Sequence, residues 1–272
     1  MFSYIWQYVL IGCLMVAPCA AQFTTTLQPR SVEEFDAYAR RVENGLEQRW
    51  TRKLPFLSLD EHPNARAAVL GGDLWIEPGG AENPISIHDG LVHDWTGAVF
   101  IPSVDIAKVV AIMQGFDRHS QIYPEVTRSR LINKKDGDIK GYWRLVRTKA
   151  GITVVLDVTQ DAYWREVAAG KWICRAYSKN ISEVQDAGTP AERVLPPGQG
   201  TGYMWRLYAY WSLERVEGGV LAEGRTVSLS RDIPGMLSWA IKPFVQSVPR
   251  ESLAGMLQHT RDAALKQRSG AG

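Results

Sequence analysis

The sequence predicts an α+β fold in which a curved antiparallel sheet wraps around one long C-terminal helix, with a helical extension at the N-terminus. Three observations predict it. A strand at Leu91–Ile101 runs directly into a helical hairpin at Val104–Tyr123. Several segments with strand character follow, and an amphipathic helix at Arg250–Lys266 closes the chain. This order leaves an apolar cavity between the sheet and the last helix.

The composition is that of a globular protein with enough apolar residues for one large domain or two small ones. Of the 272 residues, 45% are hydrophobic and 22% are charged. We expect an N-terminal extension at 22–90 that packs on a main domain at 91–267. The net charge is only +2 and the cations are scattered. This argues against nucleic acid as a partner, because its binding needs clustered Lys and Arg.

Residues 1–21 have the pattern of a secretory signal peptide. They contain no charged side chain, and an apolar core at Tyr8–Val16 precedes a run of small residues. Cleavage is expected near Ala20 or Ala21, which places the mature chain in the periplasm or outside the cell. Because the leader lacks basic residues at its start, an uncleaved membrane anchor is the alternative. Cleavage would leave Cys174 as the only cysteine and exclude an internal disulfide.

The extension begins with an amphipathic helix from Ser31 to about Arg52. Ser31 and Glu34 form a capping-box pattern at its start. Its apolar stripe at helical spacing consists of Phe35, Tyr38, Ala39, Val42, Leu46 and Trp50. Extended chain is expected at Ala65–Ile76, followed by a polar loop with Gly and Pro at Glu77–Asp89.

Alternation and turn signals predict six further strands in the main domain. They lie near Val126–Asn133, Ile139–Thr148, Gly151–Asp161, Lys171–Val184, Gly202–Val216 and Gly219–Arg231. In two of them, apolar residues share one face: Ile152–Val158, and Tyr203–Leu213, where that face is broad and aromatic. Trp205 and Trp211 on the second face either pack as core under the last helix or line the cavity.

Two segments between these elements are candidate gates of the cavity. The loop Asp186–Gly202 is too long for a passive connection in a compact domain. The segment Asp232–Pro249 is strongly apolar and contains three prolines, which break helices. Either segment can open without disturbing the sheet.

The unit Gly97–Leu131 resembles the opening of START-like, helix-grip (SRPBCC) proteins, in the branch of bacterial polyketide cyclases and lipid-transport proteins. In that family a first strand leads to a helix, a bend and a second strand, and here Asp117, Pro124 and Val126 occupy the bend. The segment Ser230–Arg261 is similar to the C-terminal helix segment of bacterial members.

The resemblance covers about residues 91–266 and implies a hydrophobic tunnel between the sheet and the last helix. Members of the family bind lipids, sterols, isoprenoids or polyketides, and some catalyse cyclisation. The side chains expected to bind a ligand here are Trp143, Trp205, Leu207, Trp211, Arg225, Leu253, Met256 and Leu257.

No pattern in the sequence predicts a catalytic, cofactor or metal site. The chain lacks a nucleophile elbow, a P-loop, a dinucleotide-binding glycine pattern and a zinc signature. His88 and His93 have neither the strand nor the helix spacing of paired metal ligands. We interpret His119 as a surface or hydrogen-bonded histidine rather than a catalytic base.

The leading hypothesis is an exported START-like protein that binds or shuttles a hydrophobic small molecule, a lipid or an isoprenoid, without catalysis or a cofactor. A cyclase- or aromatase-like enzyme is one alternative, which requires several polar side chains that converge inside the cavity. A non-catalytic interaction module at the cell envelope is the other, which predicts a fully packed interior. The leader adds proximity to a membrane as an option, and the oligomeric state is left open.

Overall fold

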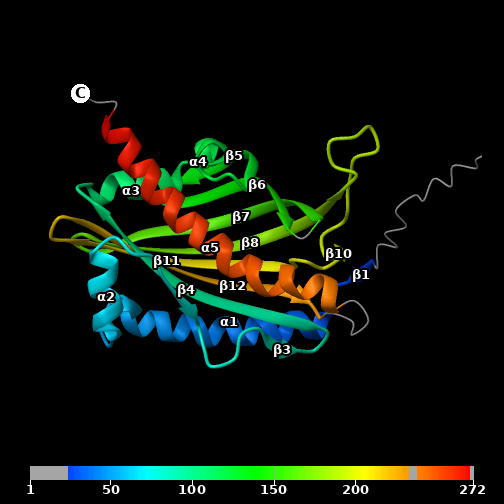
Figure 1. The fold of residues 1–272 in the computed structure, drawn as a ribbon, viewed down its shortest axis with the longest axis horizontal. Helices are drawn as coiled ribbons and strands as arrows, with labels where there is room; N and C mark the ends of the chain where they lie inside the picture. The colour runs from blue at the N-terminus through cyan, green and yellow to red at the C-terminus, as the bar shows by residue number, and fades with distance from the viewer. Residues whose placement is uncertain (1–23, 150, 233–237, 270–272) are drawn as a thin grey trace, which may run out of the picture.

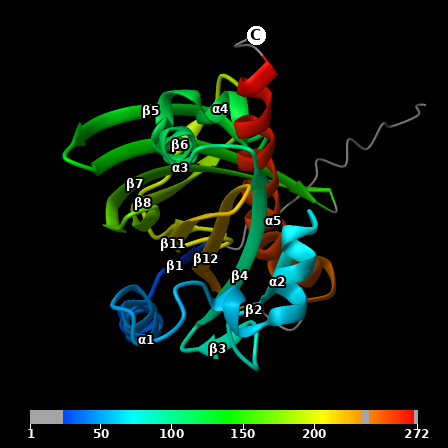
Figure 2. The same ribbon diagram turned by 90° about the vertical axis from the view of Figure 1, so that its left-hand side faces the viewer.

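The computed structural model describes residues 24–149, 151–232 and 238–269, so the predicted leader lies outside the described residues. Its centre is one large antiparallel sheet with the strand order β2-β4-β12-β11-β8-β7-β6-β5. The sheet bends around helix α5 (Ser238–Ser269) on one face, and helix α1 (Pro29–Trp50) covers the other (Figures 1 and 2). We call these the α5 face and the α1 face. The predicted α+β, helix-grip fold is confirmed.

Most of the long strands are joined by hairpins, but helices follow the first long strand and a long loop precedes the last two. The first long strand pairs with the last. In chain order the long strands are β4 (Gly90–Pro102), β5 (Val126–Lys135), β6 (Asp138–Lys149), β7 (Ile152–Ala168), β8 (Lys171–Gln185), β11 (Arg206–Val216) and β12 (Gly219–Arg231). Short strands extend the edges: β2 (Trp75–Pro78) and β3 (Ile85–Ile87) pair with β4, and β9 (Arg193–Val194) pairs with β8. A separate pair joins β1 (Thr25–Thr26) to β10 (Gln199–Gly200).

The core on the α5 face is built by α5 together with α3 (Ile106–Gln114), η2 (Phe116–Arg118) and α4 (His119–Ile122). Asp105 caps α3 by accepting a hydrogen bond from the Ala107 amide at 2.8 Å. The buried Trp211 ring lies against Gly224 of the neighbouring strand. A Cβ at that position would be 2.5 Å from the ring, so only glycine permits this contact. The part of the α5 face around Trp211 is therefore closely packed.

The α1 face is covered by the N-terminal residues: α1, η1 (Ser58–Glu61) and α2 (Pro63–Leu70). The predicted apolar stripe of α1 is buried against β12 and β11, as the alternation of both elements requires. Buried polar contacts fix the layer in place. The Trp50 indole donates to Ser212 Oγ at 2.9 Å, and the Glu223 carboxylate accepts from the amides of Ser58 and Leu59 at 3.0 and 2.9 Å.

The start of α1 differs from the prediction. The helix begins at Pro29, and Ser31 and Glu34 do not cap it. Both side chains instead hold the backbone of His88: Ser31 Oγ donates to its carbonyl at 2.6 Å, and Glu34 accepts from its amide at 2.9 Å. Pro29 at the first helical position has no N–H and needs no acceptor, so Ser31 and Glu34 are available for a tertiary contact.

Two other helix predictions are wrong. α2 occupies part of Ala65–Ile76, where extended chain was expected, because Pro63 precedes an alanine-rich run with good helix propensity. The last helix begins at Ser238, well before Arg250, and continues through Pro249. The proline-containing segment Asp232–Pro249 is thus largely helical where it is described.

The other candidate gate, the loop Asp186–Gly202, is fastened to its surroundings. β9 and β10 within it pair with β8 and β1. Glu192 forms an ion pair of 2.7 Å with Arg144, whose side chain is only 9% exposed. Thr201 binds the Glu183 carboxylate through both its amide and its hydroxyl, at 2.7 Å each. Movement of this loop would have to break all of these contacts.

Candidate ligand-binding site

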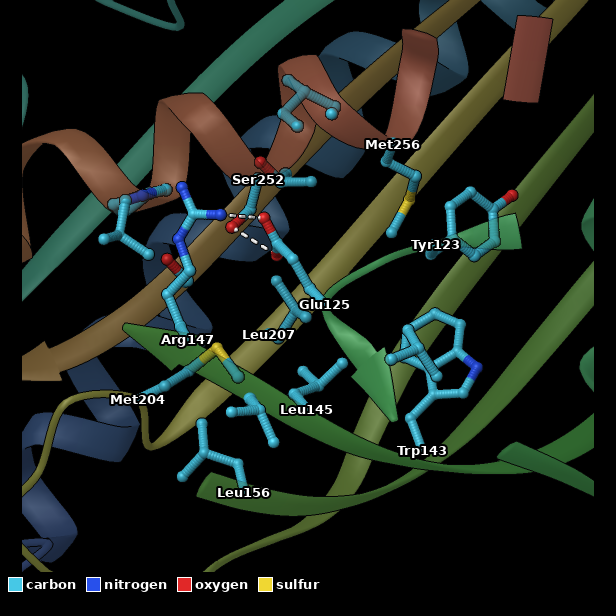
Figure 3. Close-up of a pocket in the computed structure, with 18 of the residues that line it drawn as sticks. Tyr123, Glu125, Trp143, Leu145, Arg147, Leu156, Met204, Leu207, Ser252 and Met256 are labelled. Atoms are coloured by element: carbon cyan, nitrogen blue, oxygen red, sulfur yellow. Dashed lines mark hydrogen bonds and ion pairs between the residues drawn. The ribbon is translucent and has the colours of Figure 1, made fainter. Parts of the chain in front are cut away.

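A cavity of about 150 Å³ lies on the α5 face between residues 248–259 of α5 and the strands beneath them. Figure 3 shows its walls: Tyr123 and Trp143 at one end, Arg147 and Met204 at the other, and Ser252 and Met256 on the helix above. Its lining comes from α5, from β6, β7 and β11, from residues 123–126 at the start of β5, from residues 203–204 before β11, and from β4 and β12. The main apolar members are Val126, Trp143, Leu145, Val154, Leu156, Met204, Leu207, Val248, Leu253 and Met256.

One end of the cavity is fixed by a chain of buried hydrogen bonds. Trp143 Nε1 donates to His119 Nδ1 at 2.9 Å, and His119 Nε2 lies 3.2 Å from the Ile112 carbonyl. Burial lowers the pKa of His119 to about 4, so at neutral pH the ring has the free lone pair that Trp143 needs. The interpretation of His119 as a hydrogen-bonded histidine agrees with these contacts. Beside it, the Tyr123 hydroxyl pairs with Thr260 Oγ1 at 2.9 Å.

The opposite end carries charged side chains that connect α5 to β6. Arg147 pairs with Glu125 before β5 and with Glu251 of α5, the latter at 2.6 Å, and Lys149 pairs with the same Glu251. Figure 3 shows Arg147 and Ser252 converging on Glu125. Partial burial alone would raise the pKa of Glu251, but the hydrogen bonds from Lys149 and Arg147 hold it below its ordinary value. We call Arg147, Lys149, Glu125 and Glu251 the charged latch.

The wall formed by β4 and β12 is polar. His93, Thr226 and Ser228 face the cavity from these strands, and His259 faces it from α5. His93 is 2% exposed, and burial lowers the pKa of its imidazole to about 4, so it is uncharged at neutral pH. The cavity therefore has one apolar side, and on the opposite side His93, Thr226 and Ser228 provide uncharged hydrogen-bonding groups.

The structure brings four of the eight predicted site residues together on the cavity wall: Trp143, Leu207, Leu253 and Met256. Trp211 and Leu257 lie on the same face but within the packed core. Trp205 and Arg225 lie on the α1 face. Trp205 precedes the first residue of β11, so the alternation that places Leu207 over the cavity does not extend to it.

Arg225 is not available to a ligand. Its guanidinium binds both carboxylate oxygens of buried Asp94, at 2.9 and 2.6 Å, and the carbonyl of Gly79 at 3.2 Å. Asp94 also accepts from the Tyr38 hydroxyl at 2.7 Å. These contacts join α1 to the sheet. Because β12 alternates, Arg225 points away from the cavity while its neighbour Thr226 points into it.

Several lining residues are absent from the predicted set. The alternation of Ile152–Val158 is the signal for Val154 and Leu156, which share its apolar face. The polar residues His93, Thr226 and Ser228 gave no such signal, because their role depends on the pairing of β4 with β12. In that pairing Ser228 lies directly opposite His93.

Neither metal binding nor membrane crossing is indicated by the described part of the chain. Within the described ranges, His, Cys, Asp and Glu side chains do not gather in threes as a metal site requires. None of the helices in these ranges combines the length and the apolar character needed to cross a membrane.

Comparison with known proteins gives structural neighbours only. No protein-family model matches the chain. No curated protein matches its sequence. A STAR-related lipid transfer protein from Xanthomonas axonopodis is similar in structure at 17% identity and a TM-score of 0.43, covering 65% of this chain and 96% of its own.

Two further solved structures are similar at comparably low sequence identity. The Zhui aromatase/cyclase from Streptomyces sp. R1128 has 10% identity, a TM-score of 0.43 and coverage of 66% and 98% of the two chains. Human STARD10 has 11% identity, a TM-score of 0.42 and coverage of 74% and 78%. These identities are too low to transfer a ligand or an activity from any of the neighbours.

Proposed function

We propose that this protein binds a hydrophobic small molecule in the cavity between α5 and the sheet. The observation that supports this is the cavity itself, with Leu145, Leu156, Leu207 and Met256 turned toward an interior space. Removing apolar surface of a ligand from water contributes about 25 cal/mol per Å² before the cost of immobilising it. The interaction-module alternative predicts a solid interior under α5, and the cavity counts against it.

The volume limits what the cavity holds without moving. Cavities of about 150 Å³ accept a single benzene-sized ring, whereas pockets for larger ligands span about 300–1,000 Å³. A lipid or isoprenoid chain would therefore place one end inside, or α5 would have to shift. We propose that the ligand, or its buried end, is about the size of one ring.

The residues that line the cavity fit ligand binding better than acid–base catalysis. A general acid or base at neutral pH needs a pKa near 7. Burial instead lowers the pKa of His93 to about 4 and raises that of Tyr123 to about 12. The cyclase alternative requires polar side chains in the cavity, and one wall carries them. Neither His93 nor Tyr123, however, has a pKa suited to proton transfer at neutral pH.

A filled cavity tests the proposal. We predict that Leu207→Trp will place its indole in the space and weaken binding of apolar probes by at least about tenfold, because the void rather than the surface provides the site. Ile132→Trp is the matched control, since Ile132 is 43% exposed and lies outside the cavity. Native mass spectrometry of freshly purified protein, followed by titration with toluene, provides the measurement. Equal toluene binding by both variants would refute the proposed site.

We also propose that the chain is exported, on the basis of its apolar leader at 1–21. Cell fractionation with intact-mass measurement tests this. The expected result is a chain that lacks about the first 21 residues and is found outside the cytoplasm. A full-length membrane-bound chain would favour the anchor alternative, and a full-length chain in the cytoplasm would refute export.

A further inference from the structure

The polar wall of the cavity is a continuous row of hydrogen-bonding groups on two paired strands. Ser228 lies opposite His93 in the β4–β12 register, and Thr226 lies two residues before Ser228, so all three project from the same face. All three line the cavity. We call His93, Thr226 and Ser228 the polar row.

The internal hydrogen bonds of the polar row leave capacity for a guest. His93 Nε2 lies 2.9 Å from Ser230 Oγ, and Ser230 Oγ donates to the Arg231 carbonyl at 3.3 Å. Ser230 therefore accepts from His93 Nε2–H, and among the described residues none donates to the Nδ1 lone pair of His93. In the part of the chain that the structure describes, the side-chain hydroxyls of Thr226 and Ser228 have no hydrogen-bond partner, although Ser228 is only 7% exposed.

The surroundings of the row do not favour a charged guest. The cation nearest the cavity, Arg147, already pairs with the carboxylates of Glu125 and Glu251. Glu125 lines the cavity and compensates the charge of Arg147, so this pair does not offer a free cation to an anionic guest. A buried charge without a partner costs far more than a buried hydroxyl or amide that finds hydrogen bonds.

We infer that the polar row binds an uncharged oxygen- or amide-bearing group, and that the ligand is a small neutral amphiphile. Its ring or chain end contacts Leu145, Leu156 and Leu207, while a hydroxyl, carbonyl or amide group meets Thr226 and Ser228. This inference rests on the proposed function and adds the chemical class of the ligand. The row gives the cavity a preference for neutral polar groups over both pure hydrocarbons and anions.

Two matched pairs of probes test the preference at constant shape. Phenol differs from toluene by a hydroxyl in place of a methyl group, and benzamide differs from benzoate mainly in charge. Titration of the full chain at pH 7, followed by NMR chemical shifts, measures each affinity. We expect phenol to bind about 2- to 10-fold more tightly than toluene, the equivalent of one added hydrogen bond. We expect benzamide to bind more tightly than benzoate by at least the same factor.

Substitutions in the polar row test whether its hydroxyl groups cause the preference for phenol over toluene. Thr226→Val and Ser228→Ala should each reduce the advantage of phenol over toluene, while toluene binding is retained. Thr159→Val and Ser86→Ala are the controls, since they make the same chemical changes on β7 and β3 outside the cavity lining. Thermal unfolding of all four variants reports whether any of them fails to fold.

The outcomes distinguish a failure of the polar-row inference from a failure of the proposed cavity binding. If toluene binds as tightly as phenol, or if the variants of the row leave the ratio unchanged, the inference is wrong and cavity binding stands. Tighter binding of benzoate than of benzamide would also overturn it. If none of the four probes binds, the proposed function itself fails, and the inference fails with it.

Discussion

At the scale of single residues, Glu223 is a buried carboxylate held by backbone amides. It is 4% exposed on the α1 face, and its carboxylate accepts the amides of Ser58 and Leu59. Burial raises its pKa although these two hydrogen bonds act to lower it. The side chain thus holds the start of η1 against β12 at a cost in desolvation.

Replacing this carboxylate by an amide should destabilise the fold. Glu223→Gln turns one accepting oxygen into a donor that faces an amide donor, which leaves buried groups unsatisfied and costs about 1–3 kcal/mol. Urea denaturation measures the free energy of unfolding. Glu217→Gln, at the exposed turn between β11 and β12, is the matched control and should change it by less than about 0.5 kcal/mol. A loss of the same small size in both variants would mean that the two amide contacts contribute little.

At the scale of elements, α5 is held to the sheet in two different ways. Leu253 and Leu257 are 1% exposed and anchor its middle by packing. Nearer its start the charged latch ties Glu251 to Arg147 and Lys149, whose side chains are 28% and 29% exposed. Partly exposed ion pairs of this kind contribute about 0–1 kcal/mol and weaken in salt. The part of α5 around Glu251 is therefore easier to release than the part anchored by Leu253 and Leu257.

Hydrogen–deuterium exchange can detect this difference. We predict that Glu251→Gln will leave global stability nearly unchanged but speed amide exchange in 247–256, because it removes both ion pairs and leaves Arg147 and Lys149 close together. Amides of β4 and β12 should keep the protection they have in the unmodified chain. Asp262→Asn, on an exposed turn of the same helix, provides the comparison. Unchanged exchange in 247–256 would show that packing alone holds this part of α5.

At the scale of the whole molecule, two buried histidines make stability depend on pH. The pKa of both His93 and His119 is lowered to about 4, against about 6.5 in an unfolded chain. Between these values the unfolded state binds protons that the folded state excludes. Stability is thus intact above pH 6.5 and falls as the pH decreases toward 4. Carboxylates with lowered pKa, such as Glu251, add to the loss near the acid end, whereas Glu223 opposes it.

The slope of stability against pH can be assigned by mutation. Each histidine contributes up to about 1.4 kcal/mol per pH unit between roughly pH 6 and 4.5. His119→Gln should lower stability at pH 7 and reduce this slope by about half. His88→Gln, at an exposed position, should leave both unchanged. Chemical denaturation at a series of pH values provides the data, and an unaltered slope in His119→Gln would contradict the assignment.

Most of the sheet, but only part of the cavity lining, could be predicted from the sequence. Strand positions follow from alternation and turn residues, which are local, and each predicted strand is present. The cavity depends on which strands pair, and this is why Thr226 and Ser228 were missed. Alternation predicts Trp205 on the cavity side, but Trp205 precedes the first residue of β11 and lies on the other face. Helix propensity predicts that the last helix begins after Pro249, whereas α5 continues through this proline.

The layer formed by α1 affects how the cavity responds to guests of different size. The cluster it buries includes side chains of β4, β8, β11 and β12, and within the described residues none from β5, β6 or β7. The strands that carry the polar row are therefore supported on their opposite face by the α1 layer. The strands that carry Leu145, Val154 and Leu156 do not have this support. A bulkier guest should expand the site asymmetrically, bending β6 and β7 outward while the groups that recognise its oxygen keep their positions.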